Sequence, residues 1–129
     1  MTVLLDTHAA LWWAAVPEAL SPAALAEIDA ADELAISAIS WWEIAWLARR
    51  GRITLGTPLA SWMLEVGRSL RTVPLTPAIA AAAAMLGDAF PKDPGDRLIY
   101  ATAVEHGWPL VSKDARLRAY DAEETVVVW

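Results

Sequence analysis

Short apolar segments alternate with longer amphipathic segments along the whole chain. This alternation is typical of βαβ units around a parallel sheet whose two faces are covered by helices. The segments of strand length are Thr2–Leu5, Leu34–Ser37, Arg71–Pro74, Leu110–Ser112 and Thr125–Val128. We therefore expect an α/β fold with a mostly parallel central sheet. A chain of 129 residues can form one domain with a substantial core, and we expect residues 1–129 to be that single domain.

Capping residues, prolines and glycines mark where the intervening helices begin and end. A serine, threonine or aspartate followed by proline is a strong helix start, because the first side chain caps the helix and proline fits its first turn. Gly51 lies where a glycine commonly ends a helix. The expected helices are Thr7–Ala15, Ser21–Ala31, Ser40–Arg50, Thr57–Gly67, Thr76–Leu86, Asp93–His106 and Ala115–Tyr120.

Four acidic side chains lie where these segments end or begin: Asp6, Glu43, Asp96 and Asp114. The carboxyl ends of parallel strands meet at one edge of a sheet, which is where open α/β sheets bind ligands. Carboxylates gathered at that edge repel each other unless a cation neutralises them, and hard divalent cations prefer oxygen ligands. The chain has no cysteine and only two histidines, so Mg²⁺ or Mn²⁺ is favoured over zinc.

Helix capping offers a structural alternative for each acid. Ser40 and Glu43 have the spacing of a capping box, and Asp93 directly precedes a proline, as an N-cap often does. Asp6 and Asp114 can also cap the helices that follow them, but a carboxylate pressed against a buried strand end needs a partner. Capping therefore explains Glu43 and Asp93 better than it explains Asp6 and Asp114.

The charge and hydropathy of the chain narrow its partners. A formal charge of −6 argues weakly against nucleic acid, because phosphate contacts usually need Lys and Arg, although divalent ions at the acids would cancel the local charge. The longest uncharged run, residues 72–87, contains two prolines and is shorter than the ~20 apolar residues that span a bilayer. The N-terminus lacks the basic region of a signal peptide. We expect a soluble, cytoplasmic protein without membrane contact.

The segments around the acids resemble a known protein family. Residues 3–8 (VLLDTH), 36–44 (ISAISWWEI), 93–99 (DPGDRLI) and 110–114 (LVSKD) are similar to the four signature segments of PIN domains, in the same order. Within that family they resemble the VapC-type toxins of bacterial toxin–antitoxin pairs. Each segment alone is a weak signal, but the four together are specific and span nearly the whole chain. The resemblance implies a PIN-like three-layer α/β/α fold.

The resemblance also implies a role for each acid. Asp6, Glu43, Asp96 and Asp114 would form a catalytic quartet that binds one or two Mg²⁺ or Mn²⁺ ions, with Asp6 and Asp96 the firmest direct ligands. Residues expected to support this quartet are Asp93, Ser112 and Thr7. Residues expected to contact a substrate phosphate are Lys113 and Arg116.

The activity implied is that of a metal-dependent endoribonuclease toxin, inhibited by a small VapB-like antitoxin and assembled as a homodimer. A divalent ion suits this chemistry because it stabilises charge on phosphate oxygens and activates water. One rival is a metal-dependent DNA nuclease or phosphatase, but no Asp-x-Asp pair follows the first strand, as it does in haloacid-dehalogenase-like phosphatases. A second rival is an inactive interaction module whose acids only cap helices.

Eight tryptophans are unusual in a chain of this size. Core packing accounts for some, and the surplus suggests a groove for a partner, because tryptophan is enriched at interface hot spots. Stacking of RNA bases on an exposed tryptophan is a further possibility. For the cluster Arg49, Arg50 and Arg52, we favour interaction with a helix C-terminus over contact with an RNA backbone. Arg97 is expected to pair with a surface carboxylate, and His8 to serve packing.

Overall fold

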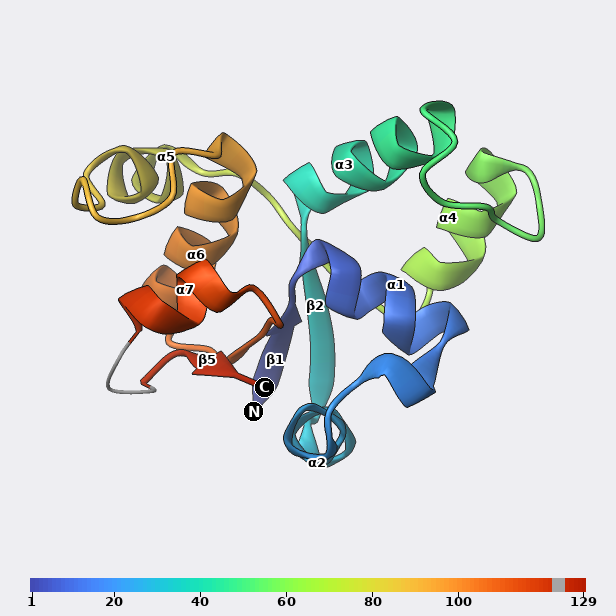
Figure 1. Cartoon of the computed structure of the whole chain (residues 1–129), viewed down its shortest axis with the longest axis horizontal. Coiled ribbons are helices and arrows are strands. Elements are labelled where there is room, and N and C mark those ends of the chain that lie inside the picture. The colour runs from blue at the N-terminus through green and yellow to red at the C-terminus, as the bar shows by residue number, and fades with distance from the viewer. Residues whose placement is uncertain (122–124) are drawn as a thin grey trace.

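The centre of the molecule is a parallel β-sheet (Figure 1). The computed structural model describes residues 1–121 and 125–129. In this part of the chain the strands are β1 (Thr2–Leu5), β2 (Glu33–Ser37), β3 (Arg71–Val73), β4 (Leu110–Val111) and β5 (Val127–Val128). They form a five-stranded sheet in the order β3-β2-β1-β4-β5, and each neighbouring pair is parallel. The strand order reverses beside β1, which is where such sheets bind ligands at their carboxyl ends.

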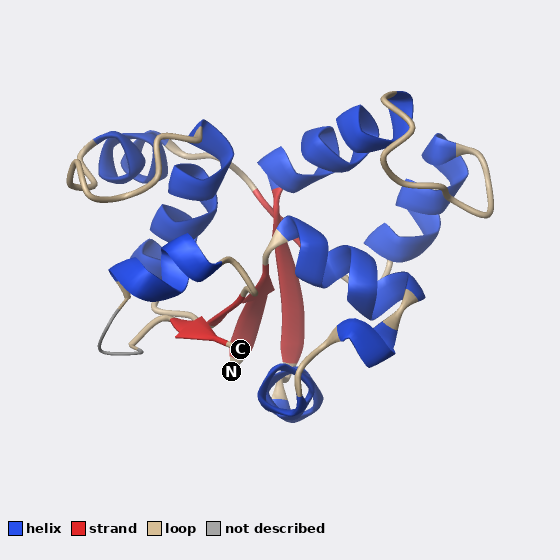
Figure 2. Ribbon diagram, in the orientation of Figure 1, coloured by secondary structure: helices blue, strands red, loops and turns tan. Residues whose placement is uncertain are grey.

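Helices cover both faces of the sheet (Figure 2). Because neighbouring side chains of a strand point to opposite faces, Val3 and Leu5 pack into one apolar cluster and Leu4 into another. The first cluster is covered by α1 (Thr7–Ala15), α2 (Pro22–Ala30), α3 (Ala38–Arg49) and α4 (Leu59–Gly67), with a short 3-10 helix at Pro17–Ala19. The second is covered by α6 (Pro94–His106) and α7 (Ala115–Tyr120), and α5 (Pro77–Ala84) packs against α6. The predicted three-layer α/β/α arrangement is confirmed.

The start of α3 differs from the prediction in a way that changes the site. The helix begins at Ala38, not at Ser40, and Ser37 is its N-cap, with a side chain that accepts a hydrogen bond from the Ile39 amide at 3.3 Å. Ser40 therefore lies inside the first turn and is fully buried. The capping-box interpretation of Ser40 and Glu43 is wrong, because the strand runs directly into the helix.

Other helix ends follow the capping chemistry closely. Ser21, Thr76 and Asp93 each accept a hydrogen bond from the amide three residues later, as an N-cap does. Gly107 ends α6 with a left-handed φ of 68°, a conformation that favours glycine. The α4 helix begins at Leu59 with Pro58 at its cap, so Thr57 does not cap it. No helix of the described residues is long and apolar enough to cross a membrane.

Arg97 anchors the loop that leads into α6. Its guanidinium donates hydrogen bonds to five backbone carbonyls, those of Ala83, Leu86, Gly87, Phe90 and Pro91. The expected pairing of Arg97 with a surface carboxylate is therefore wrong. Orphan carbonyls of a loop need donors, and one planar guanidinium supplies several in a fixed geometry. Arg97 thus fixes the position from which α6 presents Asp93 and Asp96.

Candidate active site

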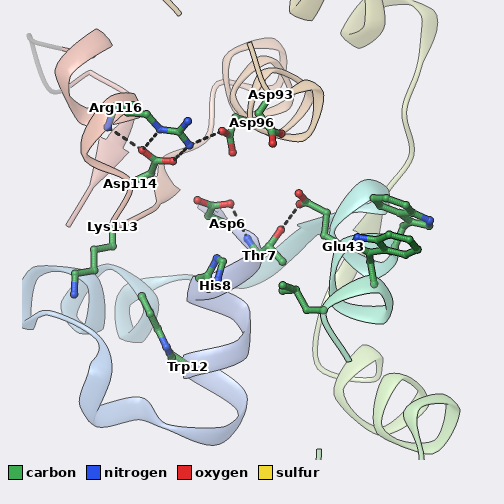
Figure 3. A pocket seen from close by; sticks show the side chains of 13 residues that line it. Asp6, Thr7, His8, Trp12, Glu43, Asp93, Asp96, Lys113, Asp114 and Arg116 are labelled. Carbon is green, nitrogen blue, oxygen red and sulfur yellow. Dashed lines mark hydrogen bonds and ion pairs between the residues drawn. The ribbon is translucent and has the colours of Figure 1, made fainter. Parts of the chain in front are cut away.

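One pocket at the carboxyl edge of the sheet collects the acidic side chains (Figure 3). It encloses about 700 Å³ between the ends of β1 and β4 and the starts of α3 and α6. Its lining comprises Asp6, Thr7, His8, Trp12, Trp42, Glu43, Trp46, Leu47, Asp93, Asp96, Lys113, Asp114 and Arg116. The predicted quartet therefore reaches one pocket from four separate parts of the chain.

Asp6 and Ser112 connect the two central strands at this edge. Asp6 follows β1 and caps α1, and its Oδ1 accepts a hydrogen bond from the Thr7 amide at 2.7 Å. Ser112 follows β4 and is fully buried; its Oγ donates to Asp6 Oδ2 at 2.6 Å and accepts from the Asp114 amide at 3.1 Å. The Ser112 hydroxyl thus orients Asp6 and the backbone of Asp114 together.

Glu43 is held by the Thr7 hydroxyl, which lies next to the buried Ser40 hydroxyl. The Thr7 hydroxyl donates to Glu43 Oε1 at 2.6 Å and lies 2.9 Å from the buried Ser40 Oγ. Gly95 lets α6 approach this carboxylate closely. A Cβ placed on Gly95 would lie 2.7 Å from Glu43 Oε2 and 3.1 Å from Asp93 Oδ1. A side chain at position 95 would therefore displace Glu43.

Asp96 and Asp114 share one arginine. The Arg116 Nη2 donates to Asp96 Oδ2 at 3.0 Å and to Asp114 Oδ2 at 2.9 Å, and Nε donates to Asp114 Oδ1 at 3.2 Å. Asp114 also caps α7 by accepting from the Arg116 amide at 2.8 Å. Asp93 accepts from the Asp96 amide at 3.1 Å, so it caps α6 while its carboxylate borders the pocket.

Burial and mutual repulsion disfavour ionised carboxylates here. Burial raises the pKa of Asp6 despite its hydrogen bonds from Ser112 and Thr7, and burial likewise raises the pKa of Glu43. Burial, followed by the charges of Asp93, Asp6 and Asp114, raises the pKa of Asp96 to about 7. The pKa of Asp114 is lowered, because its hydrogen bonds with Arg116 outweigh its partial burial. The pocket holds more negative charge than its own side chains neutralise.

The donor set fits a hard divalent cation. Among the described residues, no three acidic or histidine side chains already converge closely enough to coordinate one ion. The Arg116 guanidinium instead bridges Asp96 and Asp114. The pocket acids offer carboxylate oxygens, the ligands that Mg²⁺ and Mn²⁺ prefer, and burial raises the pKa values of Asp6 and Asp96.

The acids predicted from the sequence all line this pocket, and Asp93 caps α6 as expected. Asp6 and Asp114, which capping was expected to explain poorly, both cap helices, whereas Glu43 caps nothing. The contact of Ser40 with Thr7 and the close approach of Gly95 to Glu43 were not predicted. Gly95 could have been noticed, because glycine is a poor helix former and its presence in a first helical turn indicates a close contact there. Ser40 carried no such signal, because its role depends on the true start of α3.

Most of the tryptophans belong to the core. Six of the eight, Trp12, Trp13, Trp41, Trp62, Trp108 and Trp129, are partly buried against the two main apolar clusters. Trp42 and Trp46 differ, because their side chains are 58% and 42% exposed and line the acidic pocket. Arg49 and Arg50 place their guanidinium groups 6.0 Å and 5.0 Å from the Trp46 ring.

The protein is thus an α/β domain with a parallel sheet between two helical layers, and its acidic pocket lies where the strand order reverses. The chain belongs to the PIN-domain family, whose model matches residues 3–123.

Relatives in sequence and in structure agree with this assignment. The chain is 56% identical over 128 residues to Ribonuclease VapC22 of Mycobacterium tuberculosis (strain ATCC 25618 / H37Rv), covering 99% of this chain and 98% of that protein. Its fold is similar to a toxin-antitoxin complex from Klebsiella pneumoniae, with a TM-score of 0.69 and 20% identity over 97% of this chain and 95% of that one. VapBC2 from Rickettsia felis, bound to a promoter DNA fragment, gives a TM-score of 0.65 and 12% identity over 98% and 97% of the two chains.

Proposed function

We propose that this protein is a metal-dependent endoribonuclease that hydrolyses RNA phosphodiester bonds and acts as the toxin of a toxin–antitoxin pair. The observation that carries the proposal is the pocket of convergent carboxylates, in which burial and neighbouring acids raise the pKa of Asp96 to about 7. Such a cluster is costly without a cation, and clusters of perturbed groups in a cleft mark functional sites. Full-length similarity to Ribonuclease VapC22 supports RNA as the substrate.

In this proposal Asp6 and Asp96 are direct ligands of Mg²⁺ or Mn²⁺, and Glu43 and Asp114 complete the site or orient water. A bound divalent ion would stabilise the charge that develops on the phosphate oxygens and make a water molecule more acidic. Ser112 and Thr7 keep the carboxylates of Asp6 and Glu43 in place through hydrogen bonds of 2.6 Å. Hydroxyl groups that hydrogen-bond to metal-binding carboxylates commonly tune metal affinity.

Arg116 and Lys113 are proposed to contact the substrate phosphate. The Arg116 guanidinium bridges Asp96 and Asp114 and is 62% exposed. A cation that neutralises these acids would free the guanidinium for the phosphate, to which it can donate two hydrogen bonds. Lys113 lies next to Asp114 along the chain, with its Nζ 5.7 Å from the Trp12 ring on the wall of the pocket.

The biological setting is inferred from relatives. The solved structures that share this fold include toxin–antitoxin complexes, which supports a small VapB-like protein as an inhibitory partner. A homodimer, a cytoplasmic location and a single functional domain over residues 1–129 are part of the same proposal. Size-exclusion chromatography with light scattering measures the oligomeric state directly.

RNA cleavage by purified Asp6→Asn tests the proposal. Wild type is expected to cleave RNA in the presence of Mn²⁺ and to stop when EDTA is added, whereas Asp6→Asn remains folded and inactive. The exposed surface variant Asp29→Asn, on α2 and outside the pocket, is the matched control and retains activity. Parallel assays with single-stranded DNA and a phosphomonoester separate the two rival activities. Full RNA cleavage by Asp6→Asn contradicts the proposal.

A further inference from the structure

Trp42 and Trp46 form a stacked aromatic pair on the surface of α3. They are four residues apart and therefore lie on the same side of the helix. Their ring centroids are 5.6 Å apart and their planes meet at 12°. Both side chains remain substantially exposed, and both line the pocket that contains the acids. Neither Trp42 nor Trp46 packs against an apolar cluster of the described residues, whereas the other six tryptophans do, at least in part.

Two arginines lie beside the Trp46 ring of this aromatic pair, although the chain as a whole is acidic. Arg49 and Arg50 contact the Trp46 ring, and Arg52 follows them in sequence. Within the described part of the chain, Arg49 and Arg50 form no ion pair with a carboxylate. The net charge of the whole chain is −6, so two arginines beside the exposed Trp46 are a local exception. The dipole of α3 favours arginines at the C-terminus of the helix, but it does not explain why exposed tryptophans lie beside them.

A second aromatic–basic pair lies at the other side of the acids. The Lys113 Nζ is 5.7 Å from the centre of the Trp12 ring, and both residues line the same pocket. In the view of Figure 3, Trp12 and Lys113 lie on the side of Asp6 away from Glu43. The pocket that holds the carboxylates is thus lined by two aromatic groups that each lie near a cation. This combination suits a chain of alternating bases and phosphates.

We propose that Trp42 and Trp46 are a stacking platform for unpaired bases of single-stranded RNA next to the cleaved phosphate, and that Arg49 and Arg50 bind its backbone. The inference deepens the proposed ribonuclease function and rests on it. Parallel aromatic faces accept any base, since every base has a π face, and arginine neutralises the adjoining phosphates. Charge complementarity favours RNA over an apolar protein segment, which would gain nothing from the arginines.

The experiment measures RNA binding without cleavage. Fluorescence anisotropy follows the binding of a labelled single-stranded oligoribonucleotide to Asp6→Asn protein, in which Trp42→Ala or Trp46→Ala is added. Each truncation is expected to weaken binding about tenfold or more. Trp46→Phe retains a ring and most of the affinity. The matched control is Leu64→Ala, which truncates a 71% exposed apolar side chain on α4 outside the pocket.

An abasic oligonucleotide of the same length separates base stacking from a general loss of structure. It lacks bases to stack, so Trp42→Ala and Trp46→Ala should bind it as the parent protein does. Arg50→Gln should weaken the binding of both oligonucleotides and reduce the salt dependence by about one phosphate contact. Unchanged affinity of both tryptophan variants for normal RNA, or equal losses with the abasic chain, overturns the platform.

The same experiment keeps this inference separate from the proposed function. If wild type fails to cleave RNA, the proposed function is wrong. If wild type cleaves RNA and Trp42→Ala and Trp46→Ala cleave and bind it equally well, the proposed function stands and the platform alone is wrong.

Discussion

Two buried acidic regions of this molecule use carboxylates in opposite ways. Asp121, at the end of α7, is 5% exposed and accepts hydrogen bonds from the Thr125 hydroxyl at 2.9 Å and from the Val126 and Val127 amides at 2.9 Å and 2.8 Å. These hydrogen bonds outweigh its desolvation, so its pKa is lowered. In the pocket, burial prevails and the pKa values of Asp6, Glu43 and Asp96 are raised.

The difference teaches that burial of an acid does not by itself indicate function. Asp121 accepts hydrogen bonds from three donors, which stabilise its charged form, so it serves to fix the chain at β5. Asp6, Glu43 and Asp96 each accept fewer hydrogen bonds and have other acids as neighbours, and their pKa values are raised. Carboxylates that converge without enough donors to balance their charge are typical of a binding site, because a bound cation can provide the positive charge.

The largest expected effect of breaking this contrast is on catalysis. Asp96→Asn should reduce RNA cleavage by about 10³-fold or more, because the proposed metal ligand would contribute several kcal/mol of transition-state stabilisation. Asp121→Asn should leave the rate per folded molecule unchanged. Single-turnover cleavage at saturating Mn²⁺ measures both. A comparable loss of rate in both variants means that the two acidic regions do not differ in function.

Asp121→Asn and Asp96→Asn should change the free energy of unfolding at pH 8 in opposite directions. Asp121→Asn should destabilise the fold by about 1–3 kcal/mol, because backbone donors lose a charged acceptor. Asp96 behaves differently, because its pKa in the folded protein is about 7, against a usual 3.8. Its protonation therefore stabilises the fold fully below its usual pKa, and this contribution is lost as the pH rises through its raised pKa. Asp96→Asn should therefore stabilise the metal-free protein at pH 8. Urea unfolding at pH 5 and pH 8 measures both effects, and destabilisation by Asp96→Asn at pH 8 contradicts this account.

Metal binding should be weaker in acid than in mild alkali. At pH 6 most of Asp96 carries a proton that a cation must displace, so Mn²⁺ affinity should rise about tenfold between pH 6 and pH 8. Asp121→Asn should show the same rise, because its carboxylate is far from the titrating group. A flat affinity profile in the wild type shows that Asp96 is not a ligand.

The smallest effect is expected from Gly95→Ala. The added methyl would collide with the end of the Glu43 side chain, which is flexible and can move away. The fold should therefore survive while cleavage falls severalfold. In a Glu43→Ala background the same substitution should have no further effect, because the displaced carboxylate is already absent. Additive losses in that double-mutant cycle would place the damage elsewhere on α6.

Much of the fold was predictable, because the apolar strand segments and the capping residues are local signals. The sheet formed as expected, and Ser21, Thr76 and Asp93 cap their helices. The site was predictable as a set of residues, since strand ends in a parallel sheet meet at one edge. The tertiary links were not predictable.

Two examples show why those links escaped prediction. Ser40 and Thr7 are far apart in sequence, and the start of α3 at Ala38 decides that they meet beside Glu43. The bridge from Arg116 to Asp96 joins α7 to α6 and depends on the register of both helices. Such contacts depend on exact side-chain placement, which local sequence patterns do not encode.

The central proposal is that the pocket acids bind a divalent cation. Calorimetric titration with Mn²⁺ at pH 8 tests it most directly. Wild type and Asp121→Asn should bind Mn²⁺ with similar affinity, whereas Asp96→Asn should show little or no binding. Absence of Mn²⁺ binding in the wild type, or undiminished binding in Asp96→Asn, would contradict the account.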